Sequence, residues 1–340
     1  MKLSAPLTAT LGRSLAVGAF AAIAAVPAHA QDTTVSMTVE ASAIPAFIAD
    51  DRGFFGDLDV EVSKVGYDQV QALLVAGDTD IAWMSPIETV QFVSEGSDFR
   101  YFSTAGAQNM YNGIVVQADN ADEYPDVMSL EGKRLGIPGF GTGTWATFRA
   151  FSRAYYGVED PTTVFDVVTA SSGALLALVE RGQVDAALLF SGSSAAARSL
   201  PQFKTIFSFT EAMQENAGQP MVINGAVATA SWLKENPETA AKIVKGLDDA
   251  TKWIGENTAA FEDGGEYADL ARDAGWLAGP ETAQTVLTLI KDGKWYLTSD
   301  AYTPEWIGAI YTLLEEGKFL ETLPEQDAAF LAPGTLPAAQ

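Results

Sequence analysis

Short apolar stretches alternate with segments of helical periodicity over the first two thirds of this chain. In residues 35–39 (VSMTV) apolar and polar positions alternate one by one, which is the period of a half-buried strand. Further strands are predicted at residues 58–65, 81–84, 134–137, 164–168, 186–190 and 224–230. Helices are predicted between them at residues 46–51, 68–76, 86–93, 144–156 and 171–181, with another after residue 194. This alternation predicts parallel sheets built from βαβ units.

One sequence pattern occurs twice and predicts two similar lobes. Residues 72–82 and 177–187 both read A-L-x-x-x-G-x-x-D-x-A. In each copy a helix is expected to end at a glycine (Gly77 and Gly182), because glycine adopts the left-handed cap without steric strain. A tight turn and an apolar strand follow, and Asp80 and Asp185 are expected to act in that turn. Two matched lobes imply a cleft between them.

The last third of the chain has a different pattern. Residues 224–230 predict a strand that returns to the first lobe, and the chain from Ser231 onward is mostly amphipathic helix. Ile243, Leu247 and Ile254 fall on one face of the first of these helices. Two more helices are predicted at residues 281–290 and 304–314, and residues 332–340 are expected to be an irregular tail.

The first 30 residues have the pattern of a cleaved export signal. Lys2 and Arg13 are their only charges, an apolar run covers residues 15–26, and Ala28-His29-Ala30 has the A-x-A form of a signal-peptidase site. The run is shorter than the ~20 apolar residues of a membrane anchor. We therefore expect cleavage near Ala30/Gln31, an exported, periplasmic mature protein, and no stable membrane insertion.

Removal of this segment leaves a chain with neither histidine nor cysteine, since His29 is the only histidine and cysteine is absent. Histidine-based general bases, Ser-His-Asp triads, cysteine nucleophiles and zinc sites of His or Cys are thereby excluded. The net charge is −24, and loss of Lys2 and Arg13 makes it more negative. Nucleic acid is an unfavourable partner for such a chain. We expect no catalytic residues, no metal and no cofactor.

The candidate site lies where strands lead into helices, because open parallel sheets bind ligands beyond the carboxyl ends of their strands. The sharpest such segment is Gly139-Phe140-Gly141-Thr142-Gly143-Thr144, in which glycines allow a ligand close to the backbone and threonines add hydroxyls. The alternative is a simple tight turn with Thr144 as the helix cap. No Walker motif is present, and the dinucleotide fingerprint is matched only loosely.

Other candidates occupy equivalent loops in the two lobes. The aromatic ones each have a core role as the competing interpretation, and Glu88 has the helix dipole as a sufficient reason for its position. The full set of predicted ligand-binding residues is Ser42, Tyr67, Trp83, Ser85, Tyr111, Phe140, Gly141, Thr142, Gly143, Thr144, Ser172, Phe190, Ser191 and Asn224.

An ordered set of short motifs resembles one family. The motifs are Ile44-Pro45-Ala46-Phe47-Ile48-Ala49, Gly53-Phe54-Phe55, residues 77–82, 130–134 and 181–186, and Trp232-Leu233-Lys234-Glu235-Asn236-Pro237. They resemble the taurine/alkanesulfonate/nitrate branch of periplasmic substrate-binding proteins of ABC importers. The resemblance spans much of the chain after the leader and is specific for the family, not for the ligand.

The resemblance implies an α/β, two-lobed type II periplasmic-binding fold, in which each lobe is a mainly parallel sheet flanked by helices. Lobe 1 would comprise residues 31–114 and 225–340, and lobe 2 residues 115–224, with crossings near residues 112–117 and 219–227. It also implies a monomer that binds a small organic anion and delivers it to an ABC permease and ATPase in the inner membrane.

The resemblance assigns roles to particular positions. Residues 141–144 would hold a sulfonate, and Phe190 matches an aromatic residue of taurine binders. Asn224 stands where taurine binders have an aspartate, so the counter-charge for an ammonium group is missing there. Taurine, another sulfonate, an aromatic acid and a pyrimidine all remain candidate ligands.

Two other functions remain open. Pyrimidine-precursor synthases resemble the family but need an active-site histidine and a bound cofactor, which leaves a hydrolase using Asp, Glu, Ser or Lys as the enzymatic alternative. An exported sensing module is the third candidate, and nothing in the sequence separates sensing from transport.

Overall fold

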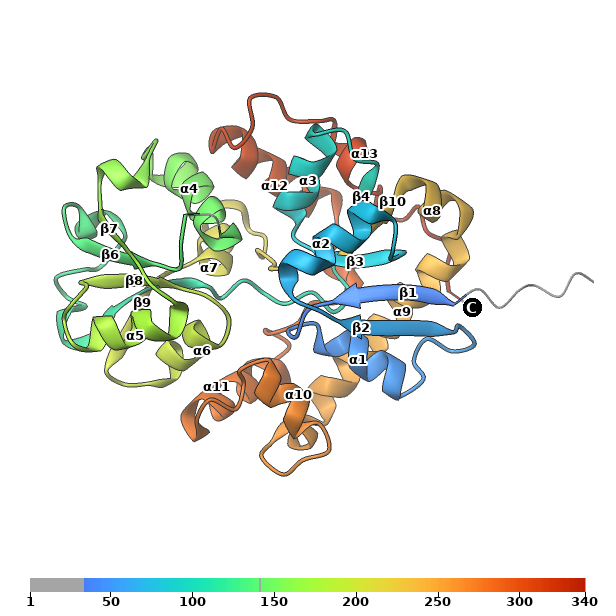
Figure 1. Ribbon diagram of the computed structural model, residues 1–340, viewed down its shortest axis with the longest axis horizontal. Coiled ribbons are helices and arrows are strands. Elements are labelled where there is room, and N and C mark those ends of the chain that lie inside the picture. Colours follow the sequence, from blue (N-terminus) through green and yellow to red (C-terminus); the bar gives the residue numbers. More distant parts are fainter. Residues whose placement is uncertain (1–33, 141, 340) are drawn as a thin grey trace, which may run out of the picture. The chain divides into compact units, whose positions relative to one another are not determined.

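Two five-stranded sheets organise the chain (Figure 1). The computed structural model describes residues 34–339 except Gly141, so the predicted leader lies outside the described residues. In the first sheet the order is β2-β1-β3-β10-β4 and in the second β7-β6-β8-β5-β9. We call the parts built on these sheets lobe 1 and lobe 2. The predicted α/β fold of two lobes, each with a mainly parallel sheet flanked by helices, is confirmed.

The strands of lobe 1 are β1 (Val35–Val39), β2 (Val60–Lys64), β3 (Ile81–Met84), β4 (Phe99–Ser103) and β10 (Gly225–Thr229). Those of lobe 2 are β5 (Gly113–Gln117), β6 (Arg134–Ile137), β7 (Asp166–Thr169), β8 (Ala186–Leu189) and β9 (Phe203–Ser208). In each sheet the fourth strand runs antiparallel to both neighbours, and this strand is the one that arrives from the other lobe: β10 in lobe 1 and β5 in lobe 2.

The edge strands β4 and β9 are absent from the strands expected above. Both pair only with a crossover strand, β4 with β10 and β9 with β5. The local sequence does not predict such a pairing, because β10, the partner of β4, lies more than 100 residues further along the chain. Strand β5 begins at Gly113, within the range expected for lobe 1, and the predicted lobe limits remain a prediction. The chain crosses between the sheets at residues 104–112 and again just before β10.

The repeated pattern forms the same structure in both lobes. Helices α2 (Tyr67–Ala76) and α5 (Ser172–Glu180) are followed by Gly77 and Gly182 with φ of 76° and 66°. Asp80 then accepts hydrogen bonds from the backbone amide and hydroxyl of Ser36, at 2.8 and 2.7 Å. Asp185 accepts the equivalent backbone bond from Arg134 at 2.8 Å. Each aspartate therefore ties its turn to the neighbouring strand, the structural role that the sequence predicted.

The helices begin directly after their capping residues, and three of them begin one or two residues earlier than predicted. Helix α1 (Ile44–Asp51) begins before the predicted residue 46, with Pro45 in its first turn. The N-cap of α2 is Gly66, so this helix begins one residue before the predicted residue 68, and the N-cap of α4 (Gly143–Tyr156) is Thr142 and not Thr144. The other helices of these lobes are α3 (Pro86–Ser94), α6 (Ser191–Ser199) and α7 (Phe209–Ala217).

The C-terminal helices pack against both lobes. They are α8 (Ala230–Glu235), α9 (Pro237–Glu256), α10 (Ala268–Asp273), α11 (Pro280–Lys291), α12 (Pro304–Glu316) and α13 (Gln326–Ala329). Short 3-10 turns occupy Ala118–Asn120, Met128–Leu130, Pro161–Thr163, Thr258–Phe261 and Ser299–Ala301. Helix α11 contacts α9 of lobe 1 and α6 of lobe 2, and α12 contacts α3 and α4 in the same way.

The hydrophobic core also continues from lobe 1 into lobe 2. Ile243, Leu247 and Ile254 of α9 are fully buried in lobe 1, as their spacing predicted. A second apolar cluster is continuous from Tyr101 and Trp306 into the phenylalanines of α4. None of the helices described here combines the length and the hydropathy needed to cross a bilayer.

Candidate functional site

The site is built from loops at one edge of each sheet. In lobe 1, Glu40 and Ser42 follow β1, Tyr67 follows β2, and Ser85 follows β3. Asn224 precedes β10, which runs in the opposite direction, so it lies at the same edge. The parallel pairing of β1 with β2 and β3 thus places five polar side chains from distant parts of the sequence around one edge.

A polar network covers the part of this edge nearest the crossover. Ser42 donates to the Glu40 carboxylate twice, from its hydroxyl and from its amide at 2.7 Å. Asn224 Nδ2 donates to Oε1 of the same carboxylate at 3.2 Å. The Tyr296 hydroxyl donates to the Ser42 carbonyl at 2.7 Å. Burial and the nearby charge of Glu40 raise the pKa of Tyr296 well above its ordinary value, so it stays a neutral donor.

A second acidic group lies beside the loop after β3. Ser85 caps α3 and accepts the amide of Glu88 at 3.1 Å. Tyr67 donates its hydroxyl to the Glu88 carboxylate. Burial raises the pKa of Glu88 above its ordinary value, although the hydrogen bonds from Tyr67 and Ser85 act in the opposite direction. The pKa of Tyr67 is raised well above its usual range by burial and by the charge of Glu88.

In lobe 2 the glycine-rich loop leads into the N-terminus of α4. Thr142 caps this helix by accepting the amide of Trp145 at 3.3 Å, and its hydroxyl donates to the Gly139 carbonyl at 2.9 Å. Its hydroxyl is therefore used within the turn, and Thr144 is buried. The amides of Gly143 and Thr144, in the first turn, have no acceptor within the helix. These two amides and the helix dipole make the start of α4 favourable for an anionic group.

Two aromatic side chains stand exposed at this edge. Phe140 is 56% exposed and meets Trp145 edge-on, and Phe190, after β8, is 38% exposed. Exposed rings of this size are uncommon among the described residues, where most large apolar side chains are buried. Both rings are in the loops that face lobe 1 and offer apolar surface for a ligand.

Tyr111 belongs to the crossover and not to a lobe wall. Its ring stacks on Trp295 with centroids 5.8 Å apart, and the Arg198 guanidinium lies 5.0 Å from its centroid. Ser194 of α6 donates to the Tyr111 carbonyl at 2.7 Å. These contacts join α6 to the crossover segment.

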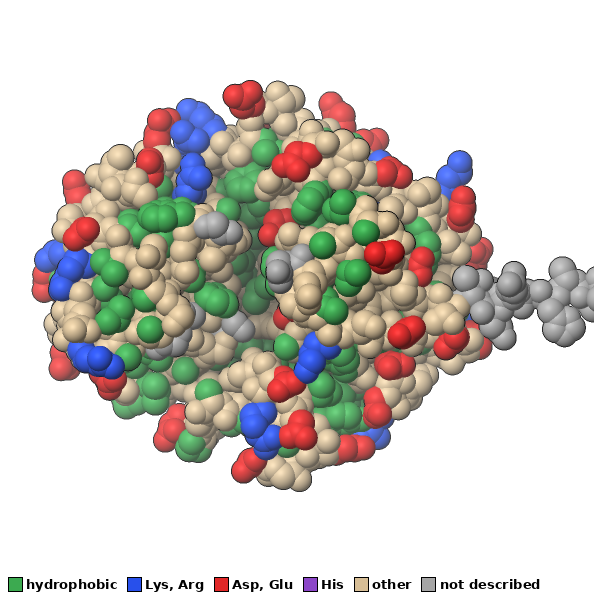
Figure 2. Space-filling model, viewed as in Figure 1, with side chains coloured by type: hydrophobic (Ala, Val, Ile, Leu, Met, Phe, Trp, Pro, Cys, Tyr) green, Lys and Arg blue, Asp and Glu red, His purple; other side chains and the backbone are tan. Residues whose placement is uncertain are grey.

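Backbone contacts bring the two edges together. A Cβ built on Gly143 would lie 3.5 Å from Glu88 Oε1, so the start of α4 faces the acidic group of lobe 1. A Cβ on Gly192, in the first turn of α6, would lie 3.2 Å from Cα of Gly275, in the loop after α10. The molecular surface is hollowed between lobe 2, on the left of the view, and lobe 1, on the right (Figure 2). We refer to this hollow as the cleft.

The other predicted residues fall in three groups. Trp83 is 1% exposed, and its ring packs in the core of lobe 1 near Gly106 and Pro45. Gly141 lies outside the described residues. Ser172 and Ser191 begin α5 and α6, but their side chains are also outside the description. For these four positions a ligand-binding role stays a prediction.

Sequence reasoning missed Glu40 as a site residue and gave Glu88 only a helix-dipole role. Glu40 follows a strand of alternating pattern, at the position where a sheet of this type binds ligands, and that position was the available signal. No cluster of three or more His, Asp or Glu side chains in residues 34–339 is arranged to hold a metal ion.

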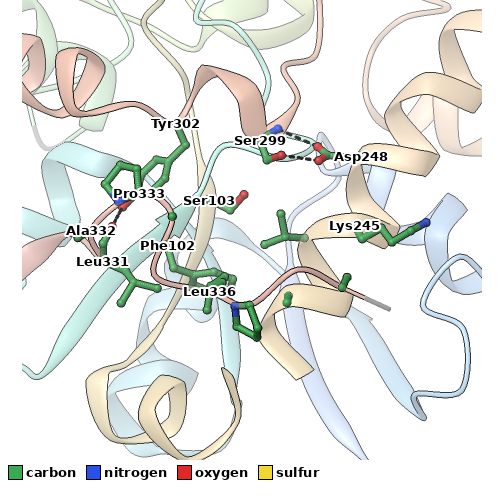
Figure 3. A pocket seen from close by; sticks show the side chains of 15 residues that line it. Phe102, Ser103, Lys245, Asp248, Ser299, Tyr302, Leu331, Ala332, Pro333 and Leu336 are labelled. Atoms are coloured by element: carbon green, nitrogen blue, oxygen red, sulfur yellow. Dashed lines mark hydrogen bonds between the residues drawn. The ribbon is translucent and has the colours of Figure 1, made fainter. Parts of the chain in front are cut away.

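A separate pocket of about 380 Å³ lies between α9, the end of β4 and the C-terminal tail (Figure 3). Its carboxylate, Asp248, accepts the amide and hydroxyl of Ser299 at 2.8 and 2.5 Å. Burial raises the pKa of Asp248 above its ordinary value. Because Asp248 is hydrogen-bonded to Ser299, the pocket offers a ligand mostly apolar side chains and the backbone of the tail. None of the predicted site residues line this pocket.

The family is decided by comparison with known proteins. A family profile described as NMT1/THI5 like matches residues 40–260. The chain belongs to the NMT1/THI5-like family. The match begins at Glu40, directly after β1, and covers the other strands of both sheets and all of α9, whereas Gly275 and Tyr296 lie beyond it. No curated protein matches the sequence significantly.

Solved structures show the fold of this family member. A protein of Bordetella bronchiseptica RB50 is 19% identical, covers 89% of this chain and 96% of its own, and superposes with a TM-score of 0.64. The periplasmic aliphatic sulphonate binding protein SsuA of Escherichia coli is 13% identical over 90% and 94% of the two chains, with a TM-score of 0.64. The alkanesulfonate-binding protein SsuA of Xanthomonas axonopodis pv. citri bound to MOPS is 15% identical over 87% and 98%, with a TM-score of 0.56. The expected periplasmic-binding-protein fold is confirmed.

Proposed function

We propose that this chain is the solute-binding component of an ABC importer and that it binds a small organic anion between its two lobes. Membership of the NMT1/THI5-like family and the periplasmic-binding-protein fold support this proposal. The protein acts as a monomeric receptor without turnover: it captures the solute, closes, and docks on a permease whose ATPase drives transport.

The observation that carries the anion is the start of α4. Its first-turn amides lie at the edge of lobe 2, and Gly143 faces Glu88 of lobe 1 across the cleft. A sulfonate or carboxylate at this point would receive backbone N–H donors and the favourable end of the helix dipole. The exposed rings of Phe140 and Phe190 would contact the organic part of the solute.

The structural neighbours agree with a sulfonate. The Escherichia coli protein is named for aliphatic sulphonates, and the Xanthomonas protein binds the sulfonate MOPS. The two aromatic rings also favour an aryl sulfonate or an aromatic acid. A flat heteroaromatic solute such as a pyrimidine is the second candidate, because the exposed rings of Phe140 and Phe190 offer aromatic surface for stacking.

The place of action follows from the N-terminal segment. We propose that residues 1–30 direct export and are removed near Ala30/Gln31, which leaves the receptor in the periplasm. Peptide sequencing of the protein recovered from the periplasm would show a start at Gln31, and recovery of intact Met1 there would contradict this assignment.

Isothermal titration tests the ligand class. We expect one of three sets to bind: alkanesulfonates, aromatic carboxylates and sulfonates, or pyrimidines. For a ligand that binds, Phe190→Ala should weaken affinity about tenfold by removing ring contact, whereas Phe92→Ala, on the far side of α3, should leave affinity unchanged. Absence of heat and of stabilisation by every set would refute the proposal, and conversion of a solute to product would favour an enzyme.

A further inference from the structure

The two edges of the cleft differ in chemistry. Lobe 2 contributes the amide donors at the start of α4, whereas lobe 1 contributes the carboxylates of Glu40 and Glu88. Neither carboxylate takes part in an ion pair within the described part of the chain. A ligand that is only an anion would leave this acidic edge without a counter-charge.

The amide of Asn224 adds an independent observation. Asn224 is only 3% exposed, and its Nδ2 donates to Glu40 Oε1. This bond fixes the orientation of the amide, because the reverse orientation would place two acceptors against each other. Oδ1 is then a buried acceptor, and it has no partner among the described residues. A buried acceptor without a donor is unfavourable, so a native structure of this kind points to a donor from outside the chain.

The Glu40 carboxylate has capacity for the same donor. Its Oε1 accepts from Ser42 Oγ and Asn224 Nδ2, and its Oε2 accepts from the Ser42 amide. A carboxylate offers about four acceptor positions, which leaves one on Oε2. Together with the two lone pairs of Asn224 Oδ1, the lobe-1 edge presents up to three acceptor positions beside a negative charge.

We propose that the natural solute carries an ammonium group as well as its anionic group, and that Glu40 and Asn224 Oδ1 bind this ammonium. An alkylammonium has three N–H donors and a positive charge, and it matches the free acceptors in number and in sign. The proposal rests on the proposed function and deepens it: the anion binds at the start of α4 and the ammonium at the β1–β10 edge.

Matched pairs of ligands test the proposal by titration calorimetry. In each pair a methyl group replaces the ammonium: taurine with propanesulfonate, and 4-(aminomethyl)benzoate with 4-ethylbenzoate. We expect the ammonium member of a pair that binds to bind at least about tenfold more tightly, the usual effect of a charge-assisted hydrogen bond. Equal or tighter binding of the methyl members would overturn the ammonium subsite, but it would not contradict the proposal that the protein is an anion receptor. Absence of binding by every member of both pairs would overturn the ammonium subsite, whereas the receptor itself is refuted only if no compound of the three ligand sets binds.

Variants locate the effect. Glu40→Gln keeps the shape and an acceptor for Asn224 but removes the charge, and we expect it to abolish most of the preference for the ammonium member. Glu61→Gln, on the exposed edge strand β2, is the matched control and should preserve the preference. If Glu40→Gln kept the preference for the ammonium member, Glu40 would not be part of the subsite. Thermal unfolding shows whether Glu40→Gln is folded, and the wild-type ratio alone decides the proposal if it is not.

Discussion

At the scale of the residue, two aspartates at equivalent positions show how a short motif acquires a tertiary function. Asp80 and Asp185 both accept a backbone amide from the strand next to their own turn. Asp185 also pairs with the Arg134 guanidinium at 2.9 Å. The hydrogen bonds from Arg134 and its charge lower the pKa of Asp185, so the ionised form is favoured by folding.

Asp185→Asn should therefore reduce stability at neutral pH by about 1–2 kcal/mol, because it replaces charge-assisted hydrogen bonds by neutral ones. A carboxyl group with a lowered folded-state pKa contributes stability above its unfolded value of 3.8, and this contribution is lost as the pH falls toward the lowered value. The stability difference between wild type and Asp185→Asn should shrink below about pH 4. Urea unfolding at pH 7 and pH 3 measures it, with exposed Asp122→Asn as the control. A difference independent of pH would contradict the assignment.

The contacts of Glu40, Glu88 and Asn224 could not be predicted from the sequence, whereas the turns that contain Asp80 and Asp185 could. The sequence placed a strand end at Glu40, yet nothing local indicates that a residue 184 positions later donates to its carboxylate. Trp83 was a candidate for the cleft wall with a core role as the competing interpretation. Its side chain is 1% exposed in the core of lobe 1, and a ligand-binding role for it stays a prediction.

At the scale of the element, two glycines inside helices have the same intrinsic helix preference but differ in how closely neighbouring elements pack against them. Gly246 of α9 has Phe55 Cδ1 and Phe54 O at 2.6 and 2.8 Å from the position of an added Cβ, so the turn that follows α1 packs against α9 at this glycine. Gly308 of α12 has nothing within 4 Å of such an atom. Both positions have the same low intrinsic helix preference.

Gly308→Ala should stabilise the protein by about 0.5–1 kcal/mol, because alanine loses less backbone freedom on folding. Gly246→Ala should destabilise it by about 1–3 kcal/mol, because the methyl group collides with backbone that cannot yield easily. Thermal and urea unfolding of the pair measure both effects. Equal shifts of the same sign would mean that helix preference alone governs these positions.

At the scale of the whole molecule, the contacts between the lobes set the limits on the closure that we propose. The backbones of Gly192 and Gly275 approach one another so closely that neither position has room for a Cβ without adjustment. Helices α11 and α12 each contact both lobes. The closure that we propose would therefore involve the C-terminal helices as well as the two crossovers.

Gly192→Ala should hinder the closed state and weaken affinity for any ligand identified by titration about fivefold or more, while the free energy of unfolding changes little. Small-angle scattering should show a smaller ligand-induced decrease in radius of gyration for this variant than for wild type. Gly255→Ala is the control, since a Cβ there would lie 3.7 Å from the nearest atom, an ordinary contact. An unchanged affinity would show that the Gly192–Gly275 contact does not limit closure.

The sequence by itself determined the strands and helices with a local period, the two glycine-ended turns, the presence of two matched lobes and the family. These features depend on near neighbours along the chain, and their pattern is repeated in both halves. It also placed the glycine-rich loop at the start of a helix, since caps are read within four residues.

The tertiary structure alone decided the edge strands, the bridging helices and the polar composition of the cleft. Strands β4 and β9 exist because a crossover strand inserts beside them, and α11 and α12 touch lobe 2 although they follow lobe 1 in the chain. Glu40 and Asn224 meet because β1 ends and β10 begins at the same edge of one sheet, on either side of β3. Contacts between residues so distant in sequence are set by the packing of the whole sheet, which no local pattern encodes.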